Sequence, residues 1–558
     1  MIQIDADVDV EQCAPAPEDA FRLGQDAYRH GAFAAAARYF SVVLTIFPAF
    51  FAALVNRALA YWSLGALDDA ERDATAACRA DPAAAEAWMV TGAIRIDRGD
   101  GMGAAEAYRR AIALRPDLAA AQAGLAAAFL ALARHDDAQR AASLALALDP
   151  ACTHARFTLG SARSALGDPS RAVALFDQVL AAEPEHAGAR LNRGNALINL
   201  GQTEAGEADL RAATAINGDL KEAWASLGVV RTIRGDPRDA IAACDRAIAL
   251  DPDFAVAHWN RGVAALLGGD YATGFAAYEW RKRHPVYGPH FDRLPAPVWQ
   301  GGPLTGQHLL VRAEQGLGDT IMFARFLPIL ARQAAKVTLA CHATLFPLFG
   351  PLGIGLCELD DQAPGDVDVA IDQMSLPFVL RLTPETIPSA AGYLAPTEAG
   401  TRDWSNVIAK PPGTLLIGLV WAGNPGHSND QRRSLPDGAL NDLLELSGFS
   451  FRALQLGGRR GEYPVADLAP LITDFGTTAE ILNHIDALVT VDTSIAHLAG
   501  AMGKPCHILL SAACDWRWLL GRDTTPWYDS ATLHRQKRLG DWTGPVESVI
   551  SALLCMQK

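Results

Sequence analysis

Small residues recur at a fixed spacing through the first half of the chain. In each unit of 34 residues, a glycine or alanine stands 24 positions before a proline slot, and a second small residue stands 12 positions before it. Two helices can cross closely only where their side chains are small. The pattern therefore predicts a series of helix pairs. The first small position is filled by Gly24, Ala58, Gly92, Ala126, Gly160, Gly194 and Gly228.

The proline slot closes each unit and begins the turn into the next, because proline cannot continue a helix. Pro48, Pro82, Pro116, Pro150, Pro184 and Pro252 occupy it, and Gly218 stands at the midpoint of the one double gap. A period of this length predicts a helical solenoid. Segments such as AEAWMVTGAIRI and AAEAYRRAIALRPD resemble the tetratricopeptide repeat. Seven repeats span residues 17–254, and an eighth, HWNRGVAALLGGDYATGFAAYEW, follows.

A solenoid of this kind offers a concave groove that commonly holds a peptide or protein. Asn56, Asn192 and Asn260 share one slot of the repeat, two residues before the first small position. That slot faces the groove in tetratricopeptide arrays, where asparagine can bind the backbone of a partner. These residues are the candidate acceptor-binding residues. The alternative interpretation is that they are solvated helix asparagines.

The pattern of apolar and polar residues changes after a Pro- and Gly-rich stretch at residues 284–306. Short apolar runs now alternate with helical segments, which predicts parallel sheets with crossover helices. The runs fall into two groups, so we expect an α-solenoid followed by two Rossmann-like α/β lobes that face each other across a cleft. The predicted parts are a tail (1–16), a repeat superhelix (17–283), a linker (284–306), an N-terminal lobe (307–410) and a C-terminal lobe (411–558).

Composition narrows the function classes. A chain of 558 residues with a formal net charge of −15 lacks the surplus of basic residues that nucleic-acid binding requires. The nine cysteines are scattered, with no spacing typical of a metal site. The acidic N-terminus does not resemble a signal peptide, and there is no stretch of 18 apolar residues to span a membrane. A cytoplasmic protein without a metal is therefore expected.

The first motif with candidate chemistry is EQGLGDT, which directly follows the predicted strand HLLVRA. Gly316 and Gly318 would allow a tight turn close to a ligand, and Asp319 opens the next helix. The spacing is not that of a dinucleotide fingerprint. The alternative is that Asp319 only caps the helix.

The second motif is VDTSIAHLAGAMGKP, in which an apolar strand ends at Asp492. The backbone N–H groups of Thr493, Ser494 and Ile495 would point out of a helix N-terminus, a favourable site for phosphate. Asp492 would repel phosphate, so contact with sugar hydroxyls is the more plausible role. As with the first motif, Asp492 or Thr493 could be no more than a cap.

The third motif is the polar loop WAGNPGHSNDQRRSLP, which contains Arg432 and Arg433. In this order, the three motifs resemble the bacterial tetratricopeptide-repeat glycosyltransferases of the GT-B fold. This group is related to lipopolysaccharide heptosyltransferases and, more loosely, to O-GlcNAc transferases. The resemblance covers essentially the whole chain. The segment DWRWLLGRDTTPWYDSATLHRQ is similar to the closing motif of the subgroup.

The resemblance implies a role for each matching residue. It makes Asp319 the general base and Arg433 a phosphate-binding residue where heptosyltransferases carry lysine, and it assigns Asp492 and Thr493 to donor binding. Gly316 and Gly318, through their tight turn, and Ser494 and Ile495, through their N–H groups, are further candidate donor-binding residues. The donor is a nucleotide sugar used as substrate; no cofactor is implied, and transfer inverts the anomeric carbon. Some members modify flagellin with nonulosonic acids, so flagellin is a candidate acceptor.

Two further features have interpretations of their own. The D-x-D at Asp366–Asp368 is interpreted as structural. Trp516, Trp518 and Trp527 could stack on a base or sugar, with core packing expected for at least two of them.

Two functions remain as alternatives to transfer of a sugar to Ser/Thr hydroxyls of a bound protein. The first is a non-catalytic repeat scaffold with a degenerate nucleotide-sugar domain. The second is a nucleotide-sugar epimerase, which would leave the repeat arm without a purpose.

Overall fold

The computed structural model describes residues 15–557, apart from residues 292, 360, 362–363, 389–391, 397–403, 405–406, 427–428 and 458–462. Most of the expected N-terminal tail, residues 1–16, lies outside the described residues. The chain divides into two compact units, Met1–Gly218 and Asp219–Lys558. The division falls between the sixth and seventh repeats, so the last two repeats belong to the same unit as the sheets.

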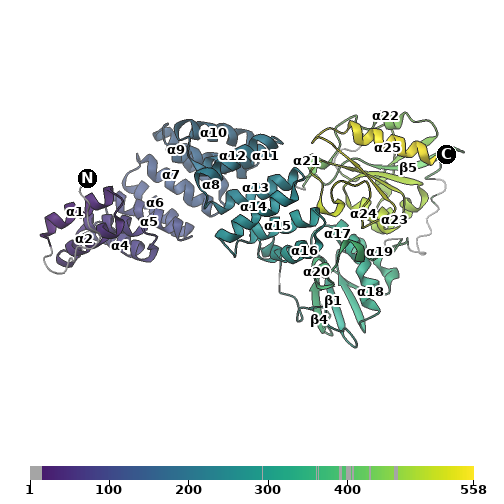
Figure 1. The fold of residues 1–558 in the computed structure, drawn as a ribbon, viewed down its shortest axis with the longest axis horizontal. Coiled ribbons are helices and arrows are strands. Elements are labelled where there is room, and N and C mark those ends of the chain that lie inside the picture. The colour runs from purple at the N-terminus through teal and green to yellow at the C-terminus, as the bar shows by residue number, and fades with distance from the viewer. Residues whose placement is uncertain are drawn as a thin grey trace. The chain divides into compact units, whose positions relative to one another are not determined.

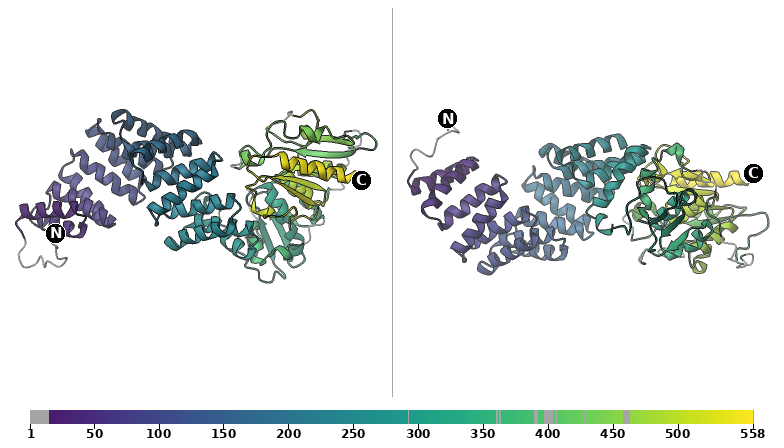
Figure 2. Two further views of the ribbon diagram at one scale, coloured as in Figure 1. Left: turned by 45° about the horizontal axis from the view of Figure 1, so that its top comes forward. Right: turned by 90° about the horizontal axis from the view of Figure 1, so that it is seen from below.

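The first unit is a series of helix pairs (Figures 1 and 2). In each pair the first helix has 13 residues and the second has 14, which confirms the predicted solenoid. The helices are α1 (Pro17–Arg29), α2 (Phe33–Ile46), α3 (Phe51–Ser63), α4 (Leu67–Ala80), α5 (Ala85–Asp97), α6 (Gly101–Leu114), α7 (Ala119–Ala131), α8 (His135–Leu148), α9 (Thr153–Ala165), α10 (Pro169–Ala182), α11 (Ala187–Asn199) and α12 (Thr203–Ile216).

The small residues lie where the two helices of a pair meet. A Cβ atom added at Gly24 would lie 2.7 Å from the ring of Phe40, and one added at Gly92 would lie 2.7 Å from the ring of Tyr108. The turn inside each pair contains one residue with positive φ, where glycine is favoured. Ala133 fills this position in one repeat, with φ of 55°. The others are Gly31, Gly65, Gly99, Gly167, Gly201, Gly235 and Gly269.

The second unit begins with the last two repeats. They consist of α13 (Lys221–Ile233), α14 (Pro237–Leu250), α15 (Ala255–Leu267) and the short α16 (Tyr271–Tyr278), which continues into the 3₁₀ helix η1 (Glu279–Arg283). Within the predicted linker, Trp299 is buried and Val298 forms a parallel bridge with Ala370. This part of the linker therefore packs against the first sheet.

Two parallel sheets follow, as the sequence predicts. The first has the order β3-β2-β1-β4 and the second has the order β10-β9-β8-β5-β6-β7. The strands of the first are β1 (His308–Arg312), β2 (Lys336–Ala340), β3 (Gly355–Cys357) and β4 (Val369–Asp372). Those of the second are β5 (Leu415–Val420), β6 (Phe449–Ala453), β7 (Ala466–Asp467), β8 (Ala487–Val491), β9 (Cys506–Leu510) and β10 (Ala531–Arg535).

Helices lie in most of the connections between strands, as is usual for parallel pairing. β8 and β9 are buried along their whole length, which is typical of strands covered on both faces. The connecting and flanking helices are α17 (Leu317–Phe323), α18 (Leu327–Ala331), α19 (Phe346–Phe349), α20 (Leu376–Val379), α21 (Asp430–Arg433), α22 (Asn441–Leu444), α23 (Phe475–His484), α24 (Ser494–Ala501) and α25 (Thr543–Met556). Among the described residues, no helix has the length and apolar character needed to cross a membrane.

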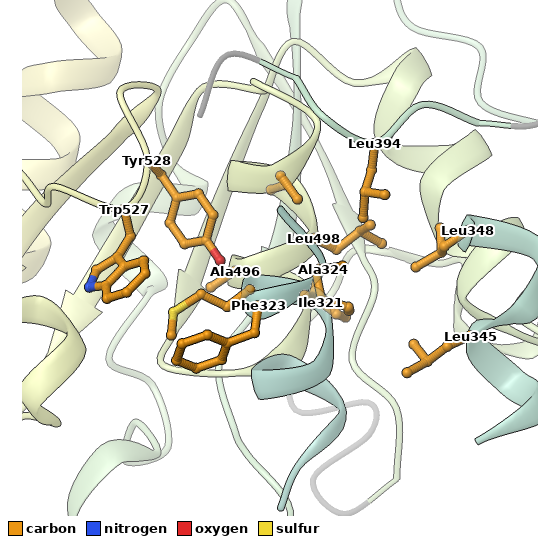
Figure 3. Close-up of a cluster of buried hydrophobic side chains, with 14 of the residues drawn as sticks. Ile321, Phe323, Ala324, Leu345, Leu348, Leu394, Ala496, Leu498, Trp527 and Tyr528 are labelled. Carbon is orange, nitrogen blue, oxygen red and sulfur yellow. The ribbon is translucent and has the colours of Figure 1, made fainter. Parts of the chain in front are cut away.

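One hydrophobic core joins both sheets to the last repeat. Figure 3 shows Ile321 and Phe323 of α17 beside Leu498 of α24, with Trp527 near Phe323. Phe323 and Trp527 are in edge-on contact, with ring centroids 5.7 Å apart. The same core contains buried residues from α15 and α16. The last repeat and the two lobes therefore share one buried interior.

The second sheet also contains a buried histidine pair. His507 Nδ1 lies 3.1 Å from His534 Nε2, and His534 Nδ1 lies 2.8 Å from the hydroxyl of Ser548. Burial, followed by the charge of His507, lowers the pKa of His534 to about 4, and burial also lowers the pKa of His507. Both rings are therefore neutral near pH 7.

We predict that this pair makes the second unit sensitive to acid. The pKa of each histidine is lower in the folded chain than the unfolded value of about 6.5, so the unfolded chain binds more protons below that pH. The free energy of unfolding therefore decreases as the pH is lowered. For His534 the expected loss is about 3 kcal/mol between pH 7 and pH 4. Urea unfolding across this range should show a shallower decline in His534→Gln than in the wild type. His342→Gln, at an exposed histidine, is the control, and an unchanged slope in His534→Gln would contradict the prediction.

Candidate functional site

The loop after β1 leads directly into α17. Gly316 precedes the helix, and Oδ2 of Asp319 accepts a hydrogen bond of 3.0 Å from the Gly316 amide. Gly316 is the N-cap, and Asp319, three residues later in the first turn of α17, stabilises the N-terminus of the helix from that position. The side chain of Asp319 is 16% exposed.

Gly318 is in contact with the other lobe. A Cβ atom at this position would lie 2.7 Å from His497 Cδ2 and 3.3 Å from the Cα of Ser494. α17 and α24 therefore pack directly against each other, and only glycine fits at the contact. The sequence interpretation placed a ligand against Gly316 and Gly318; in this structure Gly318 meets α24, and Gly316 has a negative φ of −84° with no close neighbour except Asp319. Their donor-binding roles remain predictions.

The second motif has the same arrangement at the end of β8. Asp492 follows the strand and Thr493 is the N-cap of α24, with its hydroxyl 3.1 Å from that of Thr490. Among the described residues, the amides of Ser494 and Ile495 donate no hydrogen bond. They are the orphan donors of a helix N-terminus, which favours an anion at this position. The side chain of Ile495 itself is buried in the core.

Arg517 pairs with Asp319 at the first of these strand ends and acts on Asp492 at the second through its charge, although the sequence interpretation did not select it. It lies in the 3₁₀ turn η9 (Trp516–Trp518) and is only 7% exposed. Its Nη2 donates to Oδ1 of Asp319, and its Nη1 donates to Oδ1 of Asp515 at 2.7 Å. Asp515 also accepts from the Arg517 amide at 3.0 Å. A buried guanidinium with two carboxylates is a charge-assisted pair that fixes the geometry of both acids.

The electrostatics of the site follow from this arrangement. Burial raises the pKa of Asp319, and the charge of Arg517 opposes the increase. Burial, followed by the charge of Asp515, raises the pKa of Asp492 to about 6; Trp518, Arg433 and Arg517 act in the opposite direction. Although burial opposes ionisation of Arg517, Asp319 and Asp515 raise its pKa, so it stays charged.

Two buried side chains complete the wall of the site. The indole N–H of Trp518 has no partner in hydrogen-bonding geometry among the described residues, but it lowers the pKa of Asp492. His497 stacks on Trp518 at 5.3 Å and its Nδ1 lies 3.0 Å from the Tyr528 hydroxyl. Burial and the charge of Arg517 lower the pKa of His497 to about 3, so the ring is neutral.

The third motif contributes Arg433. This residue ends α21, with its Nε 3.4 Å from Oδ1 of Asp430, and its charge lowers the pKa of Asp492. A Cβ atom at Gly423 would lie 2.6 Å from Arg433 Nε, so the glycine makes room for the guanidinium. His427 and Ser428 of this motif lie outside the described residues. The structure thus brings Asp319, Asp492 and Arg433 into one region around Arg517.

The three predicted acceptor-binding asparagines are not free side chains. Asn56 Nδ2 donates to Ala52 O at 2.8 Å, Asn192 Nδ2 to Ser161 Oγ at 3.0 Å, and Asn260 Nδ2 to Ala225 O at 3.4 Å. Asn192 and Asn260 therefore link neighbouring repeats. No described residue donates a hydrogen bond to the side-chain oxygen of any of the three, and peptide binding remains a prediction.

The other two sequence interpretations concern structural residues. Asp368 accepts from the His308 amide at 2.7 Å and Asp366 pairs with Lys336 at 3.0 Å, so the D-x-D motif supports the start of the first sheet. The tryptophans at 516, 518 and 527 are all buried, at 3%, 0% and 0% exposure. Trp516 packs on α16, where its ring centroid lies 5.7 Å from that of Phe275. Packing therefore accounts for all three in this structure.

Comparison with known proteins identifies the repeats. Tetratricopeptide-repeat family models match residues 21–85, 67–119, 164–228 and 234–283. The chain is 26% identical over 421 residues to protein FlbA of Caulobacter vibrioides, covering 63% of this chain and 70% of FlbA.

Solved structures of repeat proteins are similar over smaller parts. MamA is 25% identical with a TM-score of 0.27, covering 31% of this chain and 93% of MamA. A tetratricopeptide repeat protein from Parabacteroides merdae is 14% identical with a TM-score of 0.39, covering 44% of this chain and 98% of that protein. The repeat matches and the similarity to FlbA together support a bacterial tetratricopeptide-repeat protein that carries a second, parallel-sheet region.

Proposed function

We propose that this chain is a protein glycosyltransferase that moves a sugar from a nucleotide donor to Ser or Thr hydroxyls of a protein held by its repeats. The main support is the position of Asp319, Asp492, Arg433 and Arg517. They lie where strands of two parallel sheets end, the usual ligand position in such folds. A largely buried cluster of acids and arginines, with raised carboxylate pKa values, is typical of a functional site.

The proposed reaction assigns a role to each group. A carboxylate oxygen of Asp319 takes the proton of the acceptor hydroxyl while the oxygen of that hydroxyl attacks the anomeric carbon. The bond from the anomeric carbon to the donor phosphate breaks as the new C–O bond forms, with inversion. Arg433 and the amides of Ser494 and Ile495 stabilise the negative charge on the departing phosphate. Asp492 contacts sugar hydroxyls, and Gly316, Gly318 and Thr493 shape the donor site.

In this proposal the repeats bind the acceptor protein. Asn56, Asn192 and Asn260 keep side-chain oxygens that can accept from the backbone of an extended peptide. On the resemblance described above, flagellin is the specific candidate acceptor, and a nonulosonic acid is the candidate sugar that it would receive.

A non-catalytic scaffold is the second candidate, and one observation favours it. Both oxygens of Asp319 already accept hydrogen bonds, from Arg517 and from the Gly316 amide. The guanidinium stabilises the ionised form and opposes the pKa increase that burial causes, so Asp319 is a weaker base than a buried carboxylate without this partner. In this function the domain would bind a nucleotide or a partner without transfer.

The test is the intact mass of flagellin from the native host, with the gene deleted and then restored as wild type or as Asp319→Asn. The proposal expects loss of sugar-sized increments on deletion and recovery only with the wild-type gene. Recovery with Asp319→Asn would support the scaffold. An unchanged mass on deletion would dismiss flagellin as the acceptor.

A further inference from the structure

A buried ion pair connects the end of the repeat array to the loop that carries Asp319. Arg281, in η1 directly after α16, is 0% exposed and donates from Nε and Nη2 to the two oxygens of Glu314, at 2.8 and 2.6 Å. Glu314 also accepts from the amide of Met374, beyond the end of β4, at 2.9 Å. Glu314 therefore ties together the last repeat and two strands of the first sheet.

The next residue of the loop is held by the same repeat. The Tyr278 hydroxyl donates to Gln315 Oε1 at 3.2 Å and accepts from Gln315 Nε2 at 3.0 Å. Gln315 has a φ of 63°, a left-handed conformation that is unfavourable for a residue with a Cβ. A side-chain contact from a rigid neighbour offsets that cost and fixes the path of the chain into Gly316 and Asp319.

The segment that carries Arg517 also packs against α16. Trp516, next to Arg517, packs against Tyr271, Phe275 and Tyr278 of α16, with ring centroids 5.7–6.5 Å apart. α16 and η1 thus contact both segments whose side chains meet at Asp319.

We propose that Tyr278 and Arg281 are positioning residues, and that the final repeat is a structural part of the catalytic site. Its role is to hold loop 314–319 so that Asp319 meets Arg517. The expected effect on rate rests on the proposed function; the expected effect on the loop does not.

The test compares two matched variants of the full chain. Tyr278→Phe removes the hydroxyl that contacts Gln315. Tyr271→Phe makes the same change in the same helix at a buried tyrosine whose hydroxyl lies near Trp527 and forms no hydrogen bond with loop 314–319 in the described structure. Both retain the aromatic ring and its packing.

Tyr278→Phe is expected to speed hydrogen exchange of the amides in residues 314–320 by about tenfold, the scale of one lost hydrogen bond. It should lower kcat by a similar factor while KM for the acceptor protein is unchanged; Tyr271→Phe should do neither. Equal exchange and equal kcat in the two variants would overturn the proposal. If the wild type transfers no sugar, the proposed function fails, but the exchange comparison still decides whether Tyr278 holds the loop.

Discussion

Replacing Asp319 with asparagine is expected to lower kcat for sugar transfer by about 10²- to 10⁴-fold, the usual contribution of a general base. Asparagine has nearly the same shape and can still accept from the Gly316 amide, but it cannot take a proton from the acceptor. The measurement is steady-state transfer with purified protein, together with nucleotide binding. Binding should persist, because the phosphate contacts are assigned to Arg433 and α24.

Asp515→Asn is the matched control for this experiment. Asp515 also pairs with Arg517, so its replacement removes the same charge beside the same guanidinium. Asparagine is also a good helix N-cap, which preserves the turn at η9. We expect a much smaller decrease in kcat. Equal losses in the two variants would indicate that charge balance around Arg517, and not proton transfer, explains the effect.

Replacing Arg281 with methionine is expected to lower the free energy of unfolding of the second unit by about 3–5 kcal/mol. The change leaves Glu314, whose side chain is 8% exposed, buried without its cation. Urea unfolding followed by tryptophan fluorescence measures the loss, since Trp516, Trp518 and Trp527 lie in this core.

Two further variants test the cause of that loss. Arg283→Met removes an arginine two positions away whose ion pair with Asp253 is exposed, so a change below about 1 kcal/mol is expected. The double variant Arg281→Met, Glu314→Gln removes the unpaired charge and should recover part of the stability. No recovery would mean that lost packing, rather than the buried carboxylate, dominates.

The repeats could be predicted in detail because their determinants are local. The spacing of small residues and prolines fixes the helix pairs, and the positions of Gly24 and Gly92 against aromatic rings follow from that spacing. The alternation of apolar runs and helices likewise predicts parallel sheets. Ala133 shows the limit of such patterns: it adopts the positive φ that glycine adopts in the other repeats.

The site could be predicted only in part. Asp319 and Asp492 stand at strand ends, where the local pattern identifies them. Arg517 lies 198 residues from Asp319 along the chain, and nothing in its own segment indicates that partner. The same applies to Arg281, 33 residues before Glu314. The sequence indicates that a close approach occurs at Gly318 but not that α24 is one of the approaching groups; the donor-binding role of this glycine stays a prediction.

The boundary at Gly218 also bears on how such a protein can change during evolution. Repeats ahead of it form a unit of their own, so insertion or loss of whole 34-residue modules there leaves the contacts of Tyr278 and Arg281 intact. Insertion or loss after Asp219 would displace those contacts from the loop that they hold. The number of repeats in the first unit and the contacts to this loop are therefore under separate constraints, so the length of the array can diverge among descendants while its last two modules stay fixed.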